Sequence, residues 1–173
     1  MRRDELEHVL RAAAAVAGED DLVVVDSSAI LASAPDAPAA MLTSVEADVF
    51  PRDRPERSDL IDGAIGEGSI FQETFGYYAH GVGPETAKAP EGWQDRLVLV
   101  EGPATRGARG WCLEPHDLVL SKLVAGREKD VAFARQAVAA GIVAVATLAA
   151  RVDALPVDEE HRRAVRRLVD GLT

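Results

Sequence analysis

The segment "MLTSVEADVF", residues 41–50, places Glu46 and Asp48 two positions apart among apolar residues. If this segment is a β-strand, its period of two sends both carboxylates to one face of the sheet and the intervening apolar side chains to the other. Two like charges held side by side repel, so the pair needs water, a basic partner or a cation. The pattern therefore has two interpretations, a metal site or the solvated face of an edge strand.

The composition indicates a folded domain of ordinary size. The 173 residues are 47% hydrophobic but only 5% aromatic, which suits a core of small aliphatic side chains. A single cysteine, Cys112, excludes an internal disulfide, and no stretch reaches the ~20 apolar residues of a membrane span. We therefore expect a cytoplasmic protein without a membrane partner.

The formal net charge of −10 limits the partners of this chain. A protein that coats nucleic acid in general needs a basic field to displace the counterions of the phosphates. Arginines do gather locally, for example within residues 52–57 and 162–167, where they either contact phosphate or pair with nearby acids. The charge therefore neither requires nor excludes a specific RNA partner.

The spacing of apolar residues predicts an α+β fold, a mixed β-sheet flanked by helices with a helical C-terminal part. The apolar run in "DLVVVDSS" favours a central strand covered on both faces. The strand candidates are residues 21–28, 44–50, 69–83, 96–102 and 107–113, and the helix candidates are residues 4–17, 29–34, 56–68, 114–126, 127–142, 143–155 and 158–172. We expect an α/β core, 1–113, and a helical part, 114–173, packed together as one compact unit.

Two further motifs carry polar groups at the ends of predicted elements. In "VVVDSSAIL", Ser27, Ser28 and the free N–H groups of a helix start form a potential phosphate site, or else an ordinary helix N-cap. In "SKLVAGREKD", Lys122, Arg127 and Asp130 lie on both sides of a glycine between two helices. These three residues either contribute to a site or form an ion pair at a helix corner.

Together with the acid pair, these motifs resemble a known superfamily. A strand, a serine turn, a helix and then acid-x-acid on the next strand are typical of the DNA polymerase beta-like nucleotidyltransferases. More narrowly, "SSAILAS", "SVEADVFP", "IGEGSIFQETFGYYAHGV", "GWQDRLVLV" and "CLEPHDLVLSKLVAGREKD" resemble the small bacterial nucleotidyltransferase-like proteins near the AbiEii and MenT toxins. The resemblance runs from about Leu6 to Ile142.

The resemblance implies an enzyme that uses Mg²⁺ to transfer a nucleotide from a nucleoside triphosphate to an acceptor hydroxyl. In the toxin relatives the acceptor is the end of a tRNA, so tRNA or another RNA is an expected partner, as is a cognate antitoxin. The site residues that it implies are Glu46 and Asp48 for the metal, Ser27 for nucleotide phosphate, and Lys122 and Asp130 to complete the site, with Arg127 beside them.

These residue types suit the chemistry of nucleotidyl transfer. The reaction builds charge on phosphate oxygens, which Mg²⁺ held by carboxylates can stabilise. Lys122 and Arg127 would neutralise the phosphates, whereas Asp130 would either orient Lys122 or act as a base on the incoming hydroxyl.

Two departures from the resemblance keep other interpretations open. Asp26 stands where the turn usually has glycine, which adds a Cβ and a negative charge where phosphate should approach. Glu46 replaces the more usual aspartate and lengthens one metal ligand. The chain could therefore be a catalytically degenerate module that binds or regulates. The apolar and arginine-rich pattern of residues 162–172 would also suit a structural protein that self-associates, or simple packing of a last helix.

Overall fold

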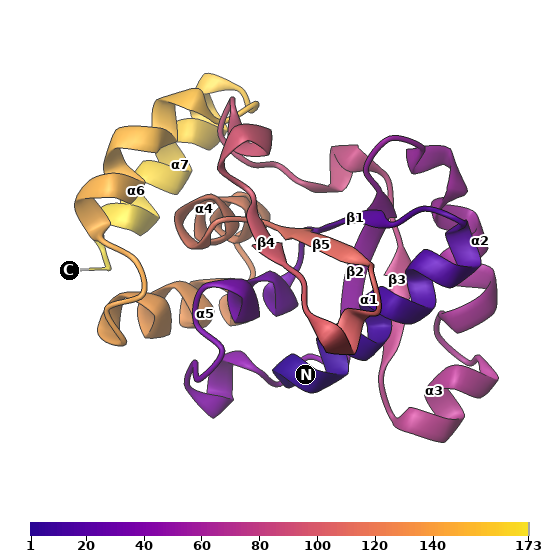
Figure 1. Ribbon diagram of the computed structural model, residues 1–173. Helices are drawn as coiled ribbons and strands as arrows, with labels where there is room; N and C mark the ends of the chain where they lie inside the picture. Colours follow the sequence, from indigo (N-terminus) through magenta and orange to yellow (C-terminus); the bar gives the residue numbers. More distant parts are fainter. Residues whose placement is uncertain (173) are drawn as a thin grey trace.

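In the computed structural model, which describes residues 1–172, a five-stranded mixed β-sheet forms the centre of the fold (Figure 1). Its strands are β1 (Asp21–Val24), β2 (Glu46–Pro51), β3 (Tyr78–Gly81), β4 (Val98–Val100) and β5 (Arg109–Cys112). Their order across the sheet is β3-β2-β1-β5-β4. β1 runs antiparallel to β2 and parallel to β5, β2 and β3 are parallel, and β4 and β5 are antiparallel.

The central position of β1 agrees with its uniformly apolar sequence. Leu22, Val23 and Val24 are each at most 2% exposed, as expected for a strand covered on both faces. β2 lies between β1 and β3, so the acid pair does not belong to an edge strand. The interpretation of Glu46 and Asp48 as the solvated face of an edge strand is therefore wrong.

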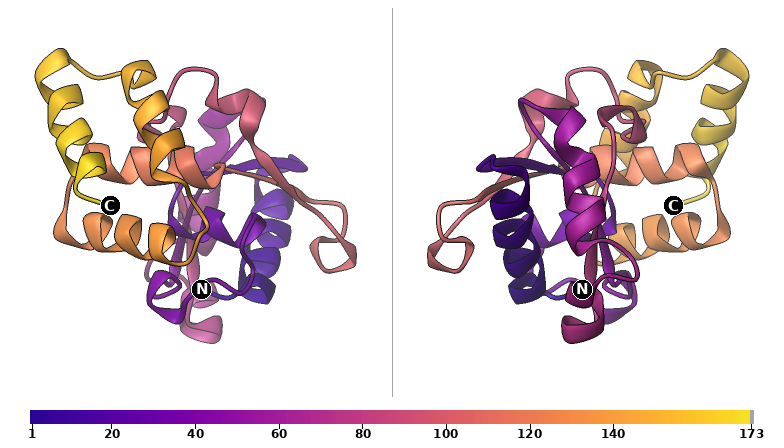
Figure 2. Two further views of the ribbon diagram at one scale, coloured as in Figure 1. Left: turned by 90° about the vertical axis from the view of Figure 1, so that its left-hand side faces the viewer. Right: turned by 90° about the vertical axis from the view of Figure 1, so that its right-hand side faces the viewer.

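Helices lie on both sides of the sheet and confirm the predicted α+β class. They are α1 (Arg3–Ala17), α2 (Ser58–Ile65), α3 (Ile70–Phe75), α4 (Pro115–Ala125), α5 (Glu128–Ala139), α6 (Val145–Arg151) and α7 (Glu159–Asp170). Figure 1 shows α1 to α3 on one side of the sheet and α4 to α7 on the other, and Figure 2 shows the same separation from two further directions. One hydrophobic core contains buried residues from the sheet and from the helices on both sides.

Two elements differ from the sequence prediction. Residues 70–75 form the helix α3 inside a segment expected to be a strand region, because Ser69 caps the helix start by accepting from the Gln72 N–H and Gly76 ends it in the left-handed conformation. Only β3 of that segment is a strand. The helix expected to start at residue 29 is instead the short 3₁₀ helix η1 (Ser27–Ala32), because prolines at positions 35 and 38 prevent a longer helix.

A buried ionic network anchors the start of α4. The Glu114 side chain accepts from the first N–H groups of this helix, and Arg151 of α6 contacts both Glu114 at 2.6 Å and Asp117 at 2.9 Å. Arg96 contacts the other oxygen of Asp117 at 2.7 Å, and the Asp117 side chain has no exposed surface. Because every charge in this network has a partner, the network ties the start of α4 to α6 and to the segment before β4.

The last helix packs onto the rest of the chain. Val165 and Val169 of α7 are fully buried, and α7 contacts both α4 and α6. The alternation of apolar residues and arginines in this helix is thus explained by packing. Among residues 1–172, no helix combines the length and the apolar character needed to cross a membrane.

Candidate functional site

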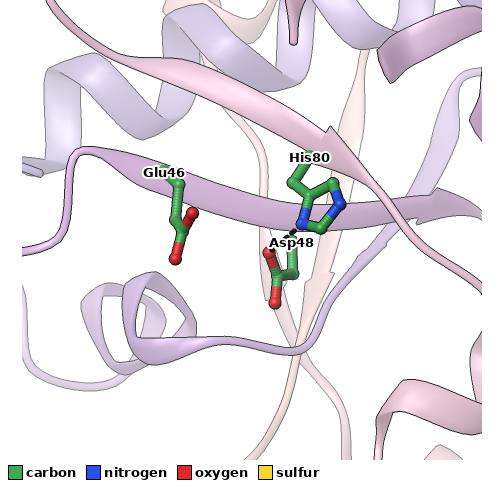
Figure 3. A group of neighbouring side chains, drawn as sticks. All are labelled: Glu46, Asp48 and His80. Atoms are coloured by element: carbon green, nitrogen blue, oxygen red, sulfur yellow. Dashed lines mark ion pairs between the residues drawn. The ribbon is translucent and has the colours of Figure 1, made fainter. Parts of the chain in front are cut away.

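The two carboxylates of β2 lie on one face of the sheet, as their spacing predicts. Figure 3 shows Glu46 and Asp48 extending to the same side of the strand, while the alternate residues Ala47 and Val49 are fully buried on the opposite face. α1 and α2 cover that opposite face. The acids therefore face away from these two helices.

β3 adds two polar side chains to the same face. Because β2 and β3 are parallel and in register, Tyr78 lies beside Glu46 and His80 beside Asp48. The Tyr78 hydroxyl donates to Glu46 Oε2 at 2.8 Å, and His80 Nδ1 lies 3.3 Å from Asp48 Oδ1 (Figure 3). Ligand atoms of Glu46, Asp48 and His80 all lie within 4.8 Å of one another.

The predicted phosphate turn lies beside the carboxylates. The backbone N–H of Val25 donates to the Asp48 carbonyl, so the turn that follows β1 begins next to β2. Ser27 lines the cavity described below. Ser28 does not line it, because its side chain is buried and its hydroxyl donates to Asp26 Oδ1.

The corner between α4 and α5 brings the predicted cations together. Gly126 adopts the left-handed conformation that ends α4, with φ of 64°, and α5 begins two residues later. Asp130 is 1% exposed and accepts from Arg127 Nε at 2.6 Å. Lys122 Nζ lies 3.6 Å from the other Asp130 oxygen and 4.9 Å from the centre of the Phe133 ring.

A cavity of about 630 Å³ joins these three groups. The carboxylates, the serine turn and the helix corner supply its walls, and the segment at residues 40–45 completes them. The predicted site residues that line the cavity are Ser27, Glu46, Asp48, Lys122, Arg127 and Asp130. Segments far apart in the sequence thus converge on one space large enough for a small-molecule substrate.

The charges in this cavity are perturbed by burial and by one another. Burial raises the pKa of Asp48, with Glu46 adding to the effect and the nearby His80 and Lys122 opposing it. Burial, and then the charge of Asp48, raise the pKa of Asp26 to about 7. Burial lowers the pKa of Lys122, while Asp26 and Asp130 oppose this effect. The negative charge that Asp26 would bring to the turn is therefore reduced at neutral pH.

The donor set fits a divalent cation. Asp48 Oδ1 and Asp26 Oδ2 are buried oxygens without a hydrogen-bond partner in the described part of the chain. The contact of Asp48 Oδ1 with His80 Nδ1 at 3.3 Å is long, and an oxygen that loses hydration without a full hydrogen bond costs free energy unless a positive charge lies nearby. Carboxylate oxygens are the ligands that Mg²⁺ prefers, and a second group, here Tyr78, holds one of them in place.

Tyr78 and His80 were absent from the residues predicted from sequence. The sequence indicates these two residues only weakly: Tyr78 and His80 carry polar groups on either side of Ala79, so they would share a face if this segment is a strand. Which strand would pair with β2, and in which register, is a property of the tertiary fold. That pairing is what places both side chains on the carboxylate face.

A mixed sheet with an acid pair on one strand, a serine turn after the neighbouring strand and cations from later helices is the arrangement expected of a nucleotidyltransferase-like protein. Residues 4–170 match the family described as a nucleotidyltransferase of unknown function (DUF6036), and the chain belongs to this family. This confirms the nucleotidyltransferase-like resemblance, whereas the closer likeness to the AbiEii and MenT toxins stays a prediction. Searches of curated proteins and of solved structures found no match.

Proposed function

We propose that this protein is a Mg²⁺-dependent nucleotidyltransferase that transfers a nucleotidyl group from a nucleoside triphosphate to an acceptor hydroxyl. The observation that carries the proposal is the cavity that Glu46, Asp48, Lys122 and Arg127 line together. Carboxylates and cations around one space are what a metal-bound triphosphate requires. The family to which the chain belongs supports the same reaction class.

In the proposed reaction the acceptor oxygen forms a bond to the α-phosphorus, the bond to the bridging oxygen breaks, and pyrophosphate leaves. Glu46 and Asp48 would hold Mg²⁺, which would supply stabilisation of the charge on the phosphate oxygens, and the proton of the acceptor hydroxyl passes to solvent water. Ser27 contacts a phosphate from the turn after β1. Ser28 acts indirectly, through its hydrogen bond to Asp26.

Lys122 and Arg127 neutralise the pyrophosphate as it leaves. Asp130 positions these two cations, and its geometry favours this role over that of a general base. Its carboxylate is 1% exposed and contacts both cations. If this carboxylate took a proton from substrate, it would lose its contacts with both cations.

For the acceptor we propose the end of an RNA, such as a tRNA, and for the biological role a toxin controlled by a cognate antitoxin. Both proposals rest on the resemblance of the sequence motifs to the toxin relatives. Asp26 supports a second candidate function, that of a catalytically degenerate module, because a carboxyl group occupies the turn where phosphate should bind.

One experiment separates the two candidates. Thermal shifts should be measured with each of the four nucleoside triphosphates, with and without Mg²⁺, together with transfer of labelled nucleotide to total RNA. An enzyme should be stabilised by a nucleotide with Mg²⁺, by ~2.7 kcal/mol at 100 times the dissociation constant. Asp48→Ala should remove the Mg²⁺ dependence and lower transfer ~100-fold or more.

Asp53→Asn provides the matched control, because Asp53 is exposed and lies outside the cavity. This variant should bind and transfer nucleotide like the wild type. Nucleotide binding without transfer would favour the degenerate module. The absence of both binding and transfer, for all four nucleotides, would contradict the proposed function.

A further inference from the structure

On the face of the sheet that carries Glu46 and Asp48, β3 adds the imidazole nitrogens of His80, which the sequence motifs did not include. His80 lies beside Asp48 in the parallel pairing of β2 and β3, and its side chain reaches over Asp48 in Figure 3. We infer that His80 is a third metal ligand beside Glu46 and Asp48, and that it makes this site select Mn²⁺ over Mg²⁺. The inference rests on the proposed function for the role of the cation, but it can be tested with the metal alone.

The distance between His80 Nδ1 and Asp48 Oδ1 suits two adjacent ligands of one ion, and Glu46 lies near enough to supply a third. Adjacent ligands of an octahedral ion, each ~2.1 Å from it, lie ~3 Å apart. His80 Nδ1 lies 3.3 Å from Asp48 Oδ1, and one ligand atom from each of the three residues falls within 4.8 Å of the others. Asp48 Oδ1 is also one of two buried carboxylate oxygens that lack a regular hydrogen bond within residues 1–172. A cation between these donors would satisfy it.

The backbone fixes these donors in place. Glu46 and Asp48 belong to an interior strand, and His80 belongs to the strand paired with it. Tyr78 donates to Glu46 and orients that carboxylate. Gly81, next to His80, lies against the backbone of α2 with no room for a Cβ. Ligands on strands supported in this way are held more rigidly than ligands on loops.

The donor types determine the preferred ion. Mg²⁺ favours oxygen ligands and keeps several of its waters. Imidazole nitrogen is a ligand of transition metals, and Mn²⁺ combines this chemistry with a preference for carboxylates. Two carboxylates and one imidazole therefore favour Mn²⁺ over Mg²⁺, in contrast to a site built from carboxylates alone.

Mn²⁺ added to the purified protein is the probe. Electron paramagnetic resonance measures free Mn²⁺ during a titration, Mg²⁺ competition gives the relative affinities, and a pulsed measurement detects nitrogen bound to Mn²⁺. We expect Mn²⁺ to bind at least ~10-fold more tightly than Mg²⁺, with a nitrogen coupling in the wild type. His80→Ala should lose the coupling and bind Mn²⁺ ~10-fold or more weakly. His80→Asp should lose the coupling and bind Mg²⁺ better than the wild type, so that the preference for Mn²⁺ over Mg²⁺ falls.

His161→Ala is the matched control, because His161 is an exposed residue of α7 outside the cavity. It should keep both the affinity and the coupling. Bound Mn²⁺ without nitrogen coupling in the wild type, coupling that persists in His80→Ala, or no Mn²⁺ binding would overturn the inference. The His80 side chain is 53% exposed, so its replacement should not prevent folding. Even if a variant does not fold, the wild-type spectrum alone shows whether nitrogen is bound to Mn²⁺.

Labelled-nucleotide transfer, measured separately, distinguishes the two proposals. A nitrogen-coupled Mn²⁺ site in a protein that neither binds nor transfers nucleotide would support the ligand role of His80 and contradict the proposed function. Nucleotide transfer that Mg²⁺ and Mn²⁺ support equally, with no nitrogen coupling, would support the proposed function and contradict the ligand role of His80.

Discussion

Asp26 lines the cavity beside Asp48, and one of its carboxylate oxygens is buried at a cost in stability. The residue keeps some exposed surface, yet its Oδ2 atom is buried and has no hydrogen-bond partner in the described chain. Its other oxygen accepts from Ser28. Burial and the nearby Asp48 raise the pKa of Asp26 from 3.8 to about 7, so this carboxyl carries less negative charge at neutral pH than an ordinary aspartate.

This pKa predicts how the stability of the protein depends on pH. A carboxyl whose folded-state pKa is raised binds its proton more tightly in the folded than in the unfolded state. The resulting loss of stability begins as pH rises through 3.8 and is complete above about 7. Asp26→Asn should therefore be about as stable as the wild type at pH 4 and more stable at pH 8, by ~2–4 kcal/mol.

Urea denaturation at the two pH values measures this difference. Asp53→Asn, which changes an exposed aspartate, should show a similar stability difference from the wild type at both pH values. The same result for Asp26→Asn would mean that Asp26 titrates normally in the folded protein. The conclusion that the Asp26 carboxyl is partly protonated at neutral pH would then be wrong.

At the residue scale, the sequence predicted that acidic and cationic side chains come together, but not that Tyr78 and His80 of β3 lie beside the acids. Glu46 and Asp48 share a face for any strand conformation, and the spacing of Lys122 and Asp130 around a glycine favours their approach. The roles assigned to these residues stay predictions. His80 could not be found in this way, because its position depends on which strand pairs with β2.

At the scale of elements, the packing of α2 against β3 sets the position of that strand. A Cβ added at Gly81 would lie 2.0 Å from the Ser58 carbonyl oxygen and 2.8 Å from its carbon. Both atoms belong to the backbone of α2, so neither can move without moving the helix. Gly81 is thus required for the close approach of α2 and β3 rather than for an unusual backbone angle.

Gly81→Ala should therefore lower the free energy of unfolding by about 1–3 kcal/mol, the usual cost of overpacking. Gly63→Ala is the matched control, since Gly63 belongs to α2 and has no atom within 4 Å of the added Cβ. In a helix, alanine in place of glycine should stabilise the protein by about 0.5–1 kcal/mol. Chemical denaturation measures both values, and a Gly81→Ala variant as stable as the wild type would contradict the close packing.

The elements most accurately predicted are those with strong periodicity. α1 and the C-terminal helices follow from apolar residues at helical spacing, and β1 follows from its continuous apolar run. α3 was mistaken for part of a strand because its aromatic residues have high strand propensity, whereas the cap at Ser69 and the glycine at position 76 decide for a helix. In a segment this short, the capping residues at the two ends outweigh the strand propensity of the residues between them.

At the scale of the molecule, we propose that the α/β core and the helices after Glu114 form one folding unit. α4 supplies side chains that are at most 1% exposed, among them Leu118, Leu120 and Leu123, and it contacts η1 beside the sheet. Removal of these helices would expose that surface to water. A fragment of residues 1–113 should therefore lack a stable fold.

Calorimetry of the whole chain and circular dichroism of the fragment check this prediction. The whole chain should unfold in a single transition whose calorimetric and van't Hoff enthalpies agree. The fragment should show no cooperative melting. Two separate transitions, or a fragment that melts cooperatively, would show instead that residues 1–113 form an independent domain.

The parallel pairing of β1 with β5 also has a consequence for synthesis of the chain. Asp21 and Arg109, partners in this pairing, are 88 positions apart. At ~5–20 residues per second, a ribosome needs about 4–18 s to add the residues between them. During this interval one edge of the central strand has no partner, and its apolar side chains are available to chaperones or to other nascent chains. The rate of translation over residues 22–109 should therefore influence how much of the newly made protein reaches its folded state.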